Sequence, residues 1–167
     1  MSRRWLAIIP LIMLILGACN NGGCLENGTT LPLAGLYSNS SQSTISVDSL
    51  EVWGVGAPGD SILLKPSRAT SSIYLPFRAN HDFVEYAFGF KSSGLNIAAL
   101  YDTITFYYES IPYFASASCG AMYIYRLINL QHTNHLIDSV GITDSLFTNV
   151  DREQIKIYYR TREDADL

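Results

Sequence analysis

Histidine, aspartate and serine side chains supply the groups that could act in catalysis, but none of them stands in a pattern that specifies a reaction. His81 and Asp82 are neighbours, as an acid–base pair could be, yet they lie in the polar segment 79–82, which is typical of an exposed turn. Serines are frequent, but no Gly-x-Ser-x-Gly sequence marks a nucleophile, and nothing indicates a base or an oxyanion hole. We therefore do not expect an enzyme, and a hydrolase assembled from distant loops is the weaker alternative.

Candidate metal and phosphate sites are equally weak. His132 and His135 have a spacing that converges on a metal only in a helix, because residues three apart in a strand point to opposite faces. With Asn134 between them, we interpret this segment as the tip of a hairpin. The glycine-rich segment 54–59 lacks the lysine and the following helix of a phosphate loop. The sequence thus predicts neither a metal nor a cofactor.

The N-terminal residues have a clearer chemical meaning. Arg3 and Arg4 precede an uncharged run from Trp5 to Leu16, which has the length of a secretory signal and is too short to span a bilayer. Leu16-Gly17-Ala18-Cys19 then resembles the bacterial lipobox, in which the cysteine is acylated. Residues 1–18 are predicted to be a lipoprotein signal peptide, and an acylated Cys19 would anchor the chain to a membrane. The alternatives are a plain signal peptide with a chance cysteine, or an uncleaved anchor.

The residues after Cys19 and the charge of the chain indicate its surroundings. Asn20 is not the aspartate that commonly marks retention in the inner membrane, so we expect an outer-membrane anchor. Residues 20–23 lack the acidic run of many surface-exported lipoproteins, which favours the periplasmic face. The formal charge of −4 becomes about −6 once residues 1–18 are removed, so we expect neither nucleic acid nor an anionic membrane as an electrostatic partner.

Two further cysteines, Cys24 and Cys119, form an even pair in an oxidising compartment, so we predict one disulfide between them. It would close a loop of about 96 residues and stabilise the fold by roughly 4–5 kcal/mol, less any native strain. Two buried free thiols are the alternative, but Cys24 lies in a turn-like segment. Because Cys24 follows Cys19 by five residues, the tether from lipid to domain would span at most about 17 Å.

Beyond residue 30 the hydrophobic pattern has a period of two, which is typical of strands with one buried face. Ile104, Phe106 and Tyr108, for example, alternate with threonine and tyrosine residues. Turn-like segments separate the runs, so we predict an all-β fold, an antiparallel β-sandwich of roughly seven to nine strands, immunoglobulin-like or transthyretin-like in outline. Residues 151–154 could form one helical turn, and the segment 95–100 is ambiguous.

The predicted organisation of the chain has four parts. Residues 1–18 are the signal peptide, 19–30 the lipidated N-terminus and short tether, 31–161 a single β-sandwich domain, and 162–167 a polar tail.

Aromatic residues are the compositional excess that could serve binding. Seven of them could form an exposed platform that stacks on sugars: Trp53, Tyr74, Tyr101, Tyr107, Tyr123, Tyr125 and Tyr158. The stronger interpretation is a sandwich core with tyrosines at its margins, because sheets enrich aromatic residues for packing alone. The strand pattern places five others in that core: Tyr86, Phe88, Phe90, Phe106 and Tyr108.

A short motif of aspartate, hydroxyl residue and aliphatic residue recurs five times. It resembles the acceptor motif for periplasmic O-glycosylation in Bacteroidota-type bacteria, and the hydroxyl residues concerned are Ser49, Ser61, Thr103, Ser139 and Ser145. The alternative is that each aspartate caps a turn from which the next strand starts. Both can hold, since a strand entry is accessible to a glycan.

Several segments together resemble an uncharacterised family of small Bacteroidota-type lipoproteins, a domain of unknown function. The resemblance rests on Cys19 and Cys24 and on five later segments: Leu75-Pro76-Phe77, residues 102–108, Ser118-Cys119-Gly120, residues 133–140 and residues 155–159. It implies a β-sandwich on a lipid anchor and transfers no catalytic residue.

These observations favour a binding or scaffolding module of the cell envelope. We expect it to act with an outer-membrane protein, such as a β-barrel protein, because the chain combines a membrane anchor with one rigid domain and no catalytic pattern. A glycan-binding lipoprotein that uses exposed aromatic side chains is the alternative function.

Overall fold

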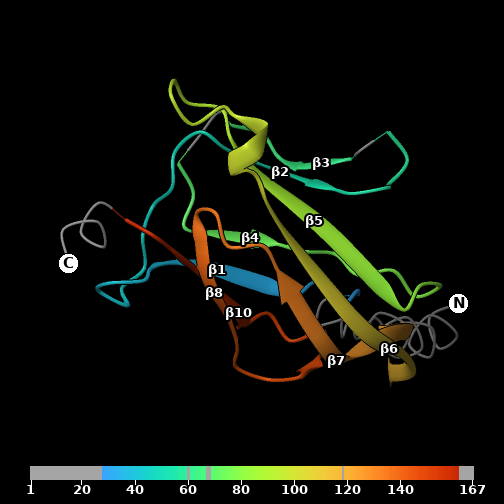
Figure 1. Cartoon of the computed structure of the whole chain (residues 1–167). Coiled ribbons are helices and arrows are strands. Elements are labelled where there is room, and N and C mark those ends of the chain that lie inside the picture. The colour runs from blue at the N-terminus through green and yellow to red at the C-terminus, as the bar shows by residue number, and fades with distance from the viewer. Residues whose placement is uncertain (1–27, 60, 67–68, 118, 162–167) are drawn as a thin grey trace, which may run out of the picture.

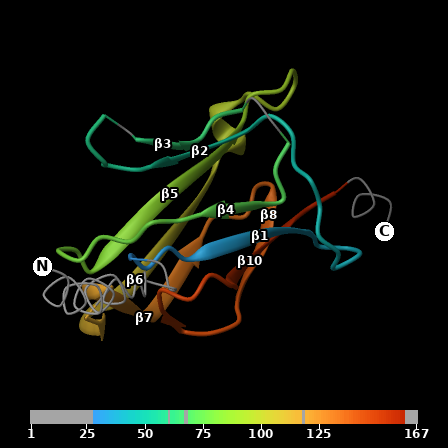
Figure 2. The same ribbon diagram turned by 180° about the vertical axis from the view of Figure 1, so that it is seen from behind.

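The computed structural model describes residues 28–161, except for residues 60, 67–68 and 118. The predicted signal peptide, Cys19, Cys24 and the polar tail therefore lie outside the described residues. The described part forms two sheets that pack face to face, one of four strands and one of six (Figures 1 and 2). The prediction of an all-β sandwich is confirmed.

The strand order is β4-β1-β10-β8 in the smaller sheet and β3-β2-β5-β6-β7-β9 in the larger one. The described residues contain ten strands: β1 (Leu33–Ser38), β2 (Leu50–Gly54), β3 (Ile62–Leu64), β4 (Ser72–Tyr74), β5 (Phe83–Phe90), β6 (Asp102–Ser116), β7 (Gly120–His132), β8 (Ile137–Ile142), β9 (Leu146–Phe147) and β10 (Glu153–Tyr159).

Two details of the predicted sandwich are wrong. The number of strands exceeds the expected range because β3, β4 and β9 contain only two or three residues, which is too few for a visible alternation. The sheets are also not wholly antiparallel, since β1 pairs with β10 in parallel. Parallel neighbours need a long connection, and here almost the whole domain lies between the two strands.

Helical structure is confined to one short turn. The ambiguous segment 95–100 contains a 3₁₀ helix, η1 (Ala98–Leu100). Residues 151–154, which could have formed one helical turn, do not do so, because β10 already starts at Glu153. Gln154 is fully buried there, and its side-chain amide donates to the Leu146 carbonyl oxygen. Within the described ranges, no helix is long and apolar enough to cross a membrane.

The core lies between the sheets and is rich in aromatic rings. Phe77 lies at its centre, with its ring centroid 4.5 Å from that of Tyr108 and 5.2 Å from that of Phe147. Four of the five aromatic residues expected in the core are buried, whereas Phe90 is only partly buried. Alternation along β5 and β6 therefore predicted the buried face correctly.

The β6–β7 hairpin extends beyond its neighbouring strands. β5 pairs with β6 only up to Tyr107, and β9 pairs with β7 only at Tyr125 and Arg126. The rest of the hairpin, towards its turn, pairs only with itself. Thr30, at the end of the predicted tether, is buried here and donates to the Tyr123 carbonyl oxygen at 2.7 Å. The N-terminal segment thus joins the domain beside this hairpin (Figure 1).

Candidate binding site

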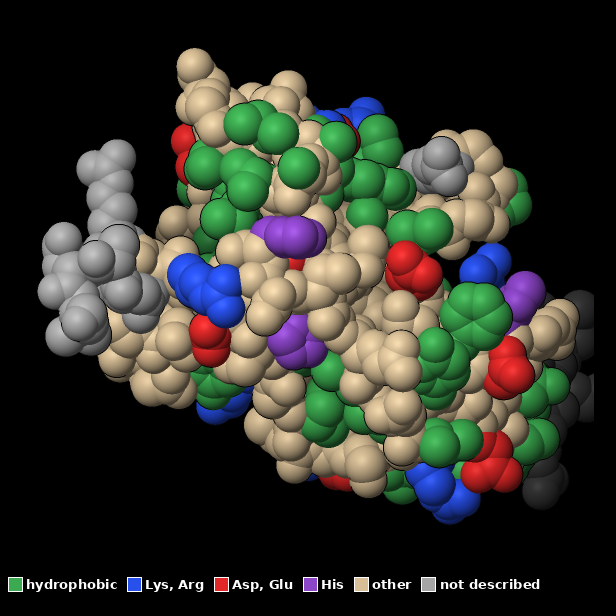
Figure 3. Space-filling view, viewed as in Figure 1, with side chains coloured by type: hydrophobic (Ala, Val, Ile, Leu, Met, Phe, Trp, Pro, Cys, Tyr) green, Lys and Arg blue, Asp and Glu red, His purple; other side chains and the backbone are tan. Residues whose placement is uncertain are grey.

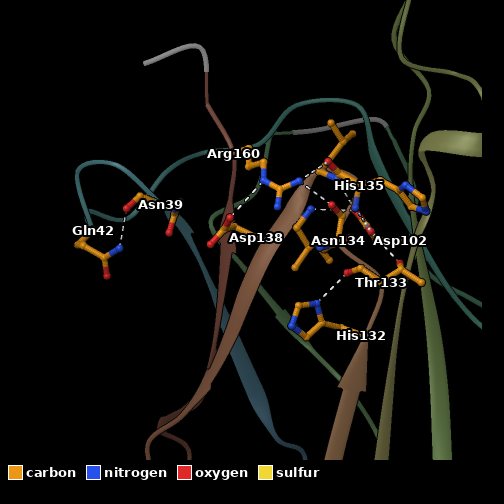
Figure 4. A network of polar contacts seen from close by, with 11 residues as sticks. Asn39, Gln42, Asp102, His132, Thr133, Asn134, His135, Asp138 and Arg160 are labelled. Atoms are coloured by element: carbon orange, nitrogen blue, oxygen red, sulfur yellow. Dashed lines mark hydrogen bonds and ion pairs between the residues drawn. The ribbon is translucent and has the colours of Figure 1, made fainter. Parts of the chain in front are cut away.

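The segment between β7 and β8 passes from the larger sheet to the smaller one. The Thr133 N–H still donates to the Thr103 carbonyl oxygen of β6 at 3.0 Å, but the N–H groups that follow need another acceptor. The carboxylate of Asp102, the first residue of β6, lies beneath this segment and is 1% exposed. It accepts hydrogen bonds from the backbone N–H groups of three consecutive residues, His135 at 2.8 Å, Leu136 at 2.7 Å and Ile137 at 2.8 Å. The Thr133 hydroxyl also donates to it, at 2.7 Å (Figure 4). One buried carboxylate therefore supplies the acceptors for three consecutive backbone N–H groups where the chain crosses between the sheets.

This geometry corrects our interpretation of residues 132–135 as a hairpin tip. β7 and β8 belong to different sheets, so the segment is a crossover. The sequence pattern of a polar loop between two strands is the same in both cases. His132 Nδ1 lies 2.7 Å from the Thr133 carbonyl oxygen. Across the described part of the chain, no three His, Cys, Asp or Glu residues form a group that could hold a metal ion.

Arg160 fixes the outer side of the same crossover. Its Nε donates to the Asp138 carboxylate at 3.1 Å, and a terminal nitrogen donates to the carbonyl oxygens of Asn134 at 2.6 Å and His135 at 3.2 Å (Figure 4). Asp102 from inside and Arg160 from outside thus hold residues 134–137 in place.

Beside this crossover the two sheets leave a cavity of about 360 Å³. That volume lies within the range of about 300–1,000 Å³ that is usual for ligand sites. Its walls are mostly apolar and come from five separate segments: Ile45 and Val47, Phe90, Leu95, Leu136, and Tyr159. Its polar lining residues are Ser46, Asp48, Ser49, Ser92, Arg160 and Thr161. We call this cavity the crossover pocket.

Tyr159 forms a wall of the crossover pocket with its ring, which meets the Phe90 ring edge-on at 5.8 Å. Its hydroxyl group is buried and has no hydrogen-bond partner among the described residues. Burial and the neighbouring charge of Asp102 raise the pKa of this phenol far above its ordinary value. Tyr159 therefore stays neutral and supplies shape rather than acid–base chemistry.

The connection between β5 and β6 forms an apolar lip at one side of the pocket. Leu95 lines the cavity and is 38% exposed, while Ile97 is 51% exposed. Ala98 and Ala99 follow and are also exposed. Figure 3 shows hydrophobic side chains gathered over this connection, which lies at the top of Figure 1. Pocket and lip together make one apolar surface, and contiguous exposed apolar surface commonly marks an interaction site.

The seven aromatic residues of the glycan-binding alternative do not share one face. Tyr125 is buried in the core, Tyr123 lies towards the end of the β6–β7 hairpin, and Tyr107 packs beside Phe83. Tyr74 and Tyr158 belong to β4 and β10 of the smaller sheet.

The remaining two rings, Trp53 and Tyr101, pack against each other edge-on at 5.6 Å. A methyl group on Gly89 would come within 3.2 Å of both rings, so they lie directly over its backbone. The Lys91 ammonium group lies 5.5 Å from the Trp53 centroid and 4.8 Å from the Tyr101 centroid, and it pairs with Glu51 at 3.1 Å. These faces are already occupied within the chain, which disfavours stacking on a sugar.

The residues of the recurring aspartate motif are spread over the molecule. Ser61 and Ser145 are exposed, whereas Ser49, Thr103 and Ser139 are partly buried. The aspartates of this motif that the structure describes all have structural partners. Asp48 accepts from the Ser49 N–H, and Asp102 and Asp138 hold the crossover. Asp144 accepts from the Leu146 N–H and pairs with Arg152. Glycosylation of any of the five hydroxyl residues stays a prediction.

Other candidates from the sequence lie apart from the crossover pocket. His81 and Asp82 are exposed, in the loop before β5. Cys119 lies in the turn of the β6–β7 hairpin, where its N–H donates to the Ser116 hydroxyl at 3.0 Å. Its predicted partner Cys24 lies outside the described residues, so this pairing stays a prediction. Sequence reasoning missed Asp102 and the pocket, because their residues meet only through the crossover.

Comparison with known proteins gives a family but no activity. The model of a family of unknown function, DUF6452, matches residues 49–159. This range contains the crossover and the whole β6–β7 hairpin, but not β1 or the predicted anchor. No curated protein and no solved structure matches the chain.

Proposed function

The chain belongs to the DUF6452 family of unknown function, and we propose that it is a lipid-anchored binding module of the cell envelope. The crossover pocket carries the proposal: an apolar cavity of about 360 Å³ continues into the exposed side chains of Leu95 and Ile97. Cys19 in its lipobox supplies the anchor, which we place on the periplasmic face of the outer membrane.

The proposed ligand is an apolar protein segment. A cavity of this volume accommodates only one or two large side chains, whereas the lip extends the apolar surface outside it. A partner that inserts an aromatic or aliphatic side chain and covers the lip would bury both, which is the arrangement of a protein interface with a central anchor residue. A small ligand inside the cavity would leave the lip exposed.

The position of the pocket favours a partner that extends away from the membrane. The β5–β6 connection and the turn of the β6–β7 hairpin lie at opposite ends of the molecule in both views (Figures 1 and 2). The N-terminal segment joins the domain beside that hairpin, so an anchored chain would present its pocket towards the periplasm. We propose that the partner is an outer-membrane protein with an apolar segment on its periplasmic side.

Site-specific photocrosslinking in native cells tests the pocket. A photoreactive residue in place of Ile97 should give an adduct with one outer-membrane protein, and Leu95→Asp should abolish that adduct. The matched control is the same residue in place of Ile62, which is 50% exposed on β3 and does not line the pocket. Absence of an adduct at position 97, or identical adducts at both positions, would contradict the proposal.

The anchor is tested independently of the pocket. Cys19→Ala should move the protein from the membrane fraction to the soluble fraction, and the intact mass of the native protein should exceed that of residues 19–167 by an acyl-glyceryl group. A native mass that matches the polypeptide alone would refute lipidation.

A further inference from the structure

The free end of the β6–β7 hairpin combines exposed aromatic side chains with a lack of charged residues. No charged residue lies between Glu109 and Arg126, although the chain as a whole has a formal charge of −4. Three large side chains are exposed there, Phe114 at 67%, Tyr123 at 43% and Tyr113 at 41%. We call these three residues the aromatic tip. Exposed apolar side chains gathered in this way commonly mark an interaction site.

The strand pairing places the aromatic tip away from the body of the sandwich. Beyond Tyr108 and Tyr125, the two arms of the hairpin pair only with each other, so Pro112 lies opposite Tyr123 and Phe114 opposite Ala121. Among the described residues no third strand pairs with this part of the hairpin, and its three rings are exposed. The tip therefore reaches a surface outside the protein before the sandwich does.

The N-terminal segment leads to the same place. Thr30 donates to the Tyr123 carbonyl oxygen, and Gly28 to Leu31 line a cavity together with Ala121 and Met122. Cys19 precedes Gly28 by nine residues, so the proposed lipid lies within about 32 Å of this end along a fully extended chain. The predicted Cys24–Cys119 disulfide would shorten that reach to about 17 Å, measured from the hairpin turn.

We propose that the aromatic tip inserts into the headgroup region of the phospholipid membrane that carries the acylated Cys19. This inference rests on the proposed anchor, and it adds a second contact between the domain and the bilayer. Aromatic side chains with a polar end prefer the membrane–water interface, and the lack of charges means that no ionised group must lose its water. Contact through rings is also compatible with the acidic composition, which disfavours electrostatic attraction to anionic lipids.

Depth-dependent fluorescence quenching tests the insertion. The full chain is purified from native membranes and reconstituted in phosphatidylethanolamine–phosphatidylglycerol vesicles whose acyl chains are brominated near the headgroup. Phe114→Trp supplies the reporter, and Ile97→Trp, at the opposite end and 51% exposed, is the matched control. Trp53 contributes the same background to both proteins. We expect the bromine atoms to quench the tryptophan fluorescence of the Phe114→Trp protein. The fluorescence of the Ile97→Trp protein should be quenched no more than that of Trp53 alone.

Each outcome separates the insertion from the anchor. An acylated protein whose tryptophan at position 114 is not quenched overturns the insertion and leaves the anchor intact. A chain that carries no lipid, but is quenched at position 114 with excess vesicles, refutes the anchor and supports the insertion. A blue shift of the tryptophan emission at position 114 that appears without vesicles and grows with protein concentration would show that a second copy of the chain covers the aromatic tip. That result also overturns the insertion.

Discussion

The Asp102 carboxylate accepts three consecutive backbone N–H groups and one hydroxyl group, and it does so at 1% exposure. In the sequence, Asp102 is one of several aspartates that precede a hydroxyl residue and an aliphatic residue, and it looks like an ordinary turn residue. Its importance comes from its burial, because a buried N–H group that loses its acceptor cannot bind water instead.

Asp102→Ala should lower the free energy of unfolding by about 3 kcal/mol or more, because several buried N–H groups lose their acceptor at once and each such loss costs about 1–3 kcal/mol. Urea denaturation followed by circular dichroism measures the change. Asp138→Ala is the control, since it removes a partly exposed ion pair with Arg160 and should cost less than about 1 kcal/mol. Equal losses from the two substitutions would show that the crossover does not depend on Asp102.

Tyr159→Phe should stabilise the protein by about 1 kcal/mol at neutral pH, because it removes a buried hydroxyl group that has no hydrogen-bond partner within the described residues. Burial raises the pKa of Tyr159 in the folded state above the ordinary value of 10.0, while the unfolded chain ionises near that value. The stability that depends on this group is therefore complete below pH 10 and declines as the pH rises above it.

Above pH 10, the free energy of unfolding should fall with rising pH less steeply in the Tyr159→Phe protein than in the original protein. The difference between the two slopes should be about 1.4 kcal/mol per pH unit. Urea denaturation across the alkaline range measures both effects. A destabilised Tyr159→Phe protein at neutral pH would mean that the hydroxyl group has a partner after all.

At the scale of secondary structure, the parallel pair β1–β10 is the least expected element of the fold. A contact across this pair depends on a glycine: Tyr37 donates to a Glu153 carboxylate oxygen at 2.7 Å, and the Glu153 side chain passes directly over Gly35. A methyl group at Gly35 would lie 2.0 Å from the other carboxylate oxygen and 2.8 Å from the Tyr37 ring. The missing side chain thus leaves room for the bond between Tyr37 and Glu153.

Gly35→Ala should displace the Glu153 side chain and lower the free energy of unfolding by about 1 kcal/mol. This value is near the lower end of the range for an added methyl group in a packed site, because the Glu153 side chain can move. The bond to Glu153 is the main cause that raises the pKa of Tyr37, so that pKa should also fall towards its ordinary value. Denaturation with urea and tyrosine absorbance between neutral and alkaline pH record the two changes.

Gly141→Ala on β8, which pairs with the other side of β10, is the matched control for Gly35→Ala. Its added methyl group would lie 3.5 Å from the Tyr158 ring, which is ordinary contact, so little change is expected. A Gly35→Ala protein as stable as the Gly141→Ala protein would contradict the crowding argument.

At the scale of the whole molecule, the two ends of the sandwich have different surfaces. One end holds the crossover pocket with its apolar lip, and the other holds the aromatic tip beside the N-terminal segment. Under the proposed function, the second end faces the membrane and the first faces the partner. The predicted Cys24–Cys119 disulfide would join the tether to the hairpin turn and so fix this orientation.

Cys24→Ser should lower the free energy of unfolding by roughly 4–5 kcal/mol, less any native strain, because it would open a loop of about 96 residues. It should also increase proteolysis before Thr30. The double substitution with Cys119→Ser should equal the single one, since two residues of one bond do not act additively. Different stabilities of the single and double variants, or a protein that reductant leaves unchanged, would refute the disulfide.

The sequence by itself determined the class of the fold and its buried faces. Alternation places Ile104, Phe106 and Tyr108 on one side of a strand, and that pattern is a local property of an extended backbone. The sequence also contains the lipobox, because signal processing acts on a short linear segment before folding.

Only the tertiary structure decided which strands are neighbours and what lies between them. The same polar loop could turn back as a hairpin or cross to the other sheet, and its choice depends on the Asp102 carboxylate, more than 30 residues away along the chain. The crossover pocket likewise combines side chains from β5, β10 and three loops. Strand pairing and cavities depend on contacts between residues far apart in the sequence, and a local hydrophobic pattern does not determine those contacts.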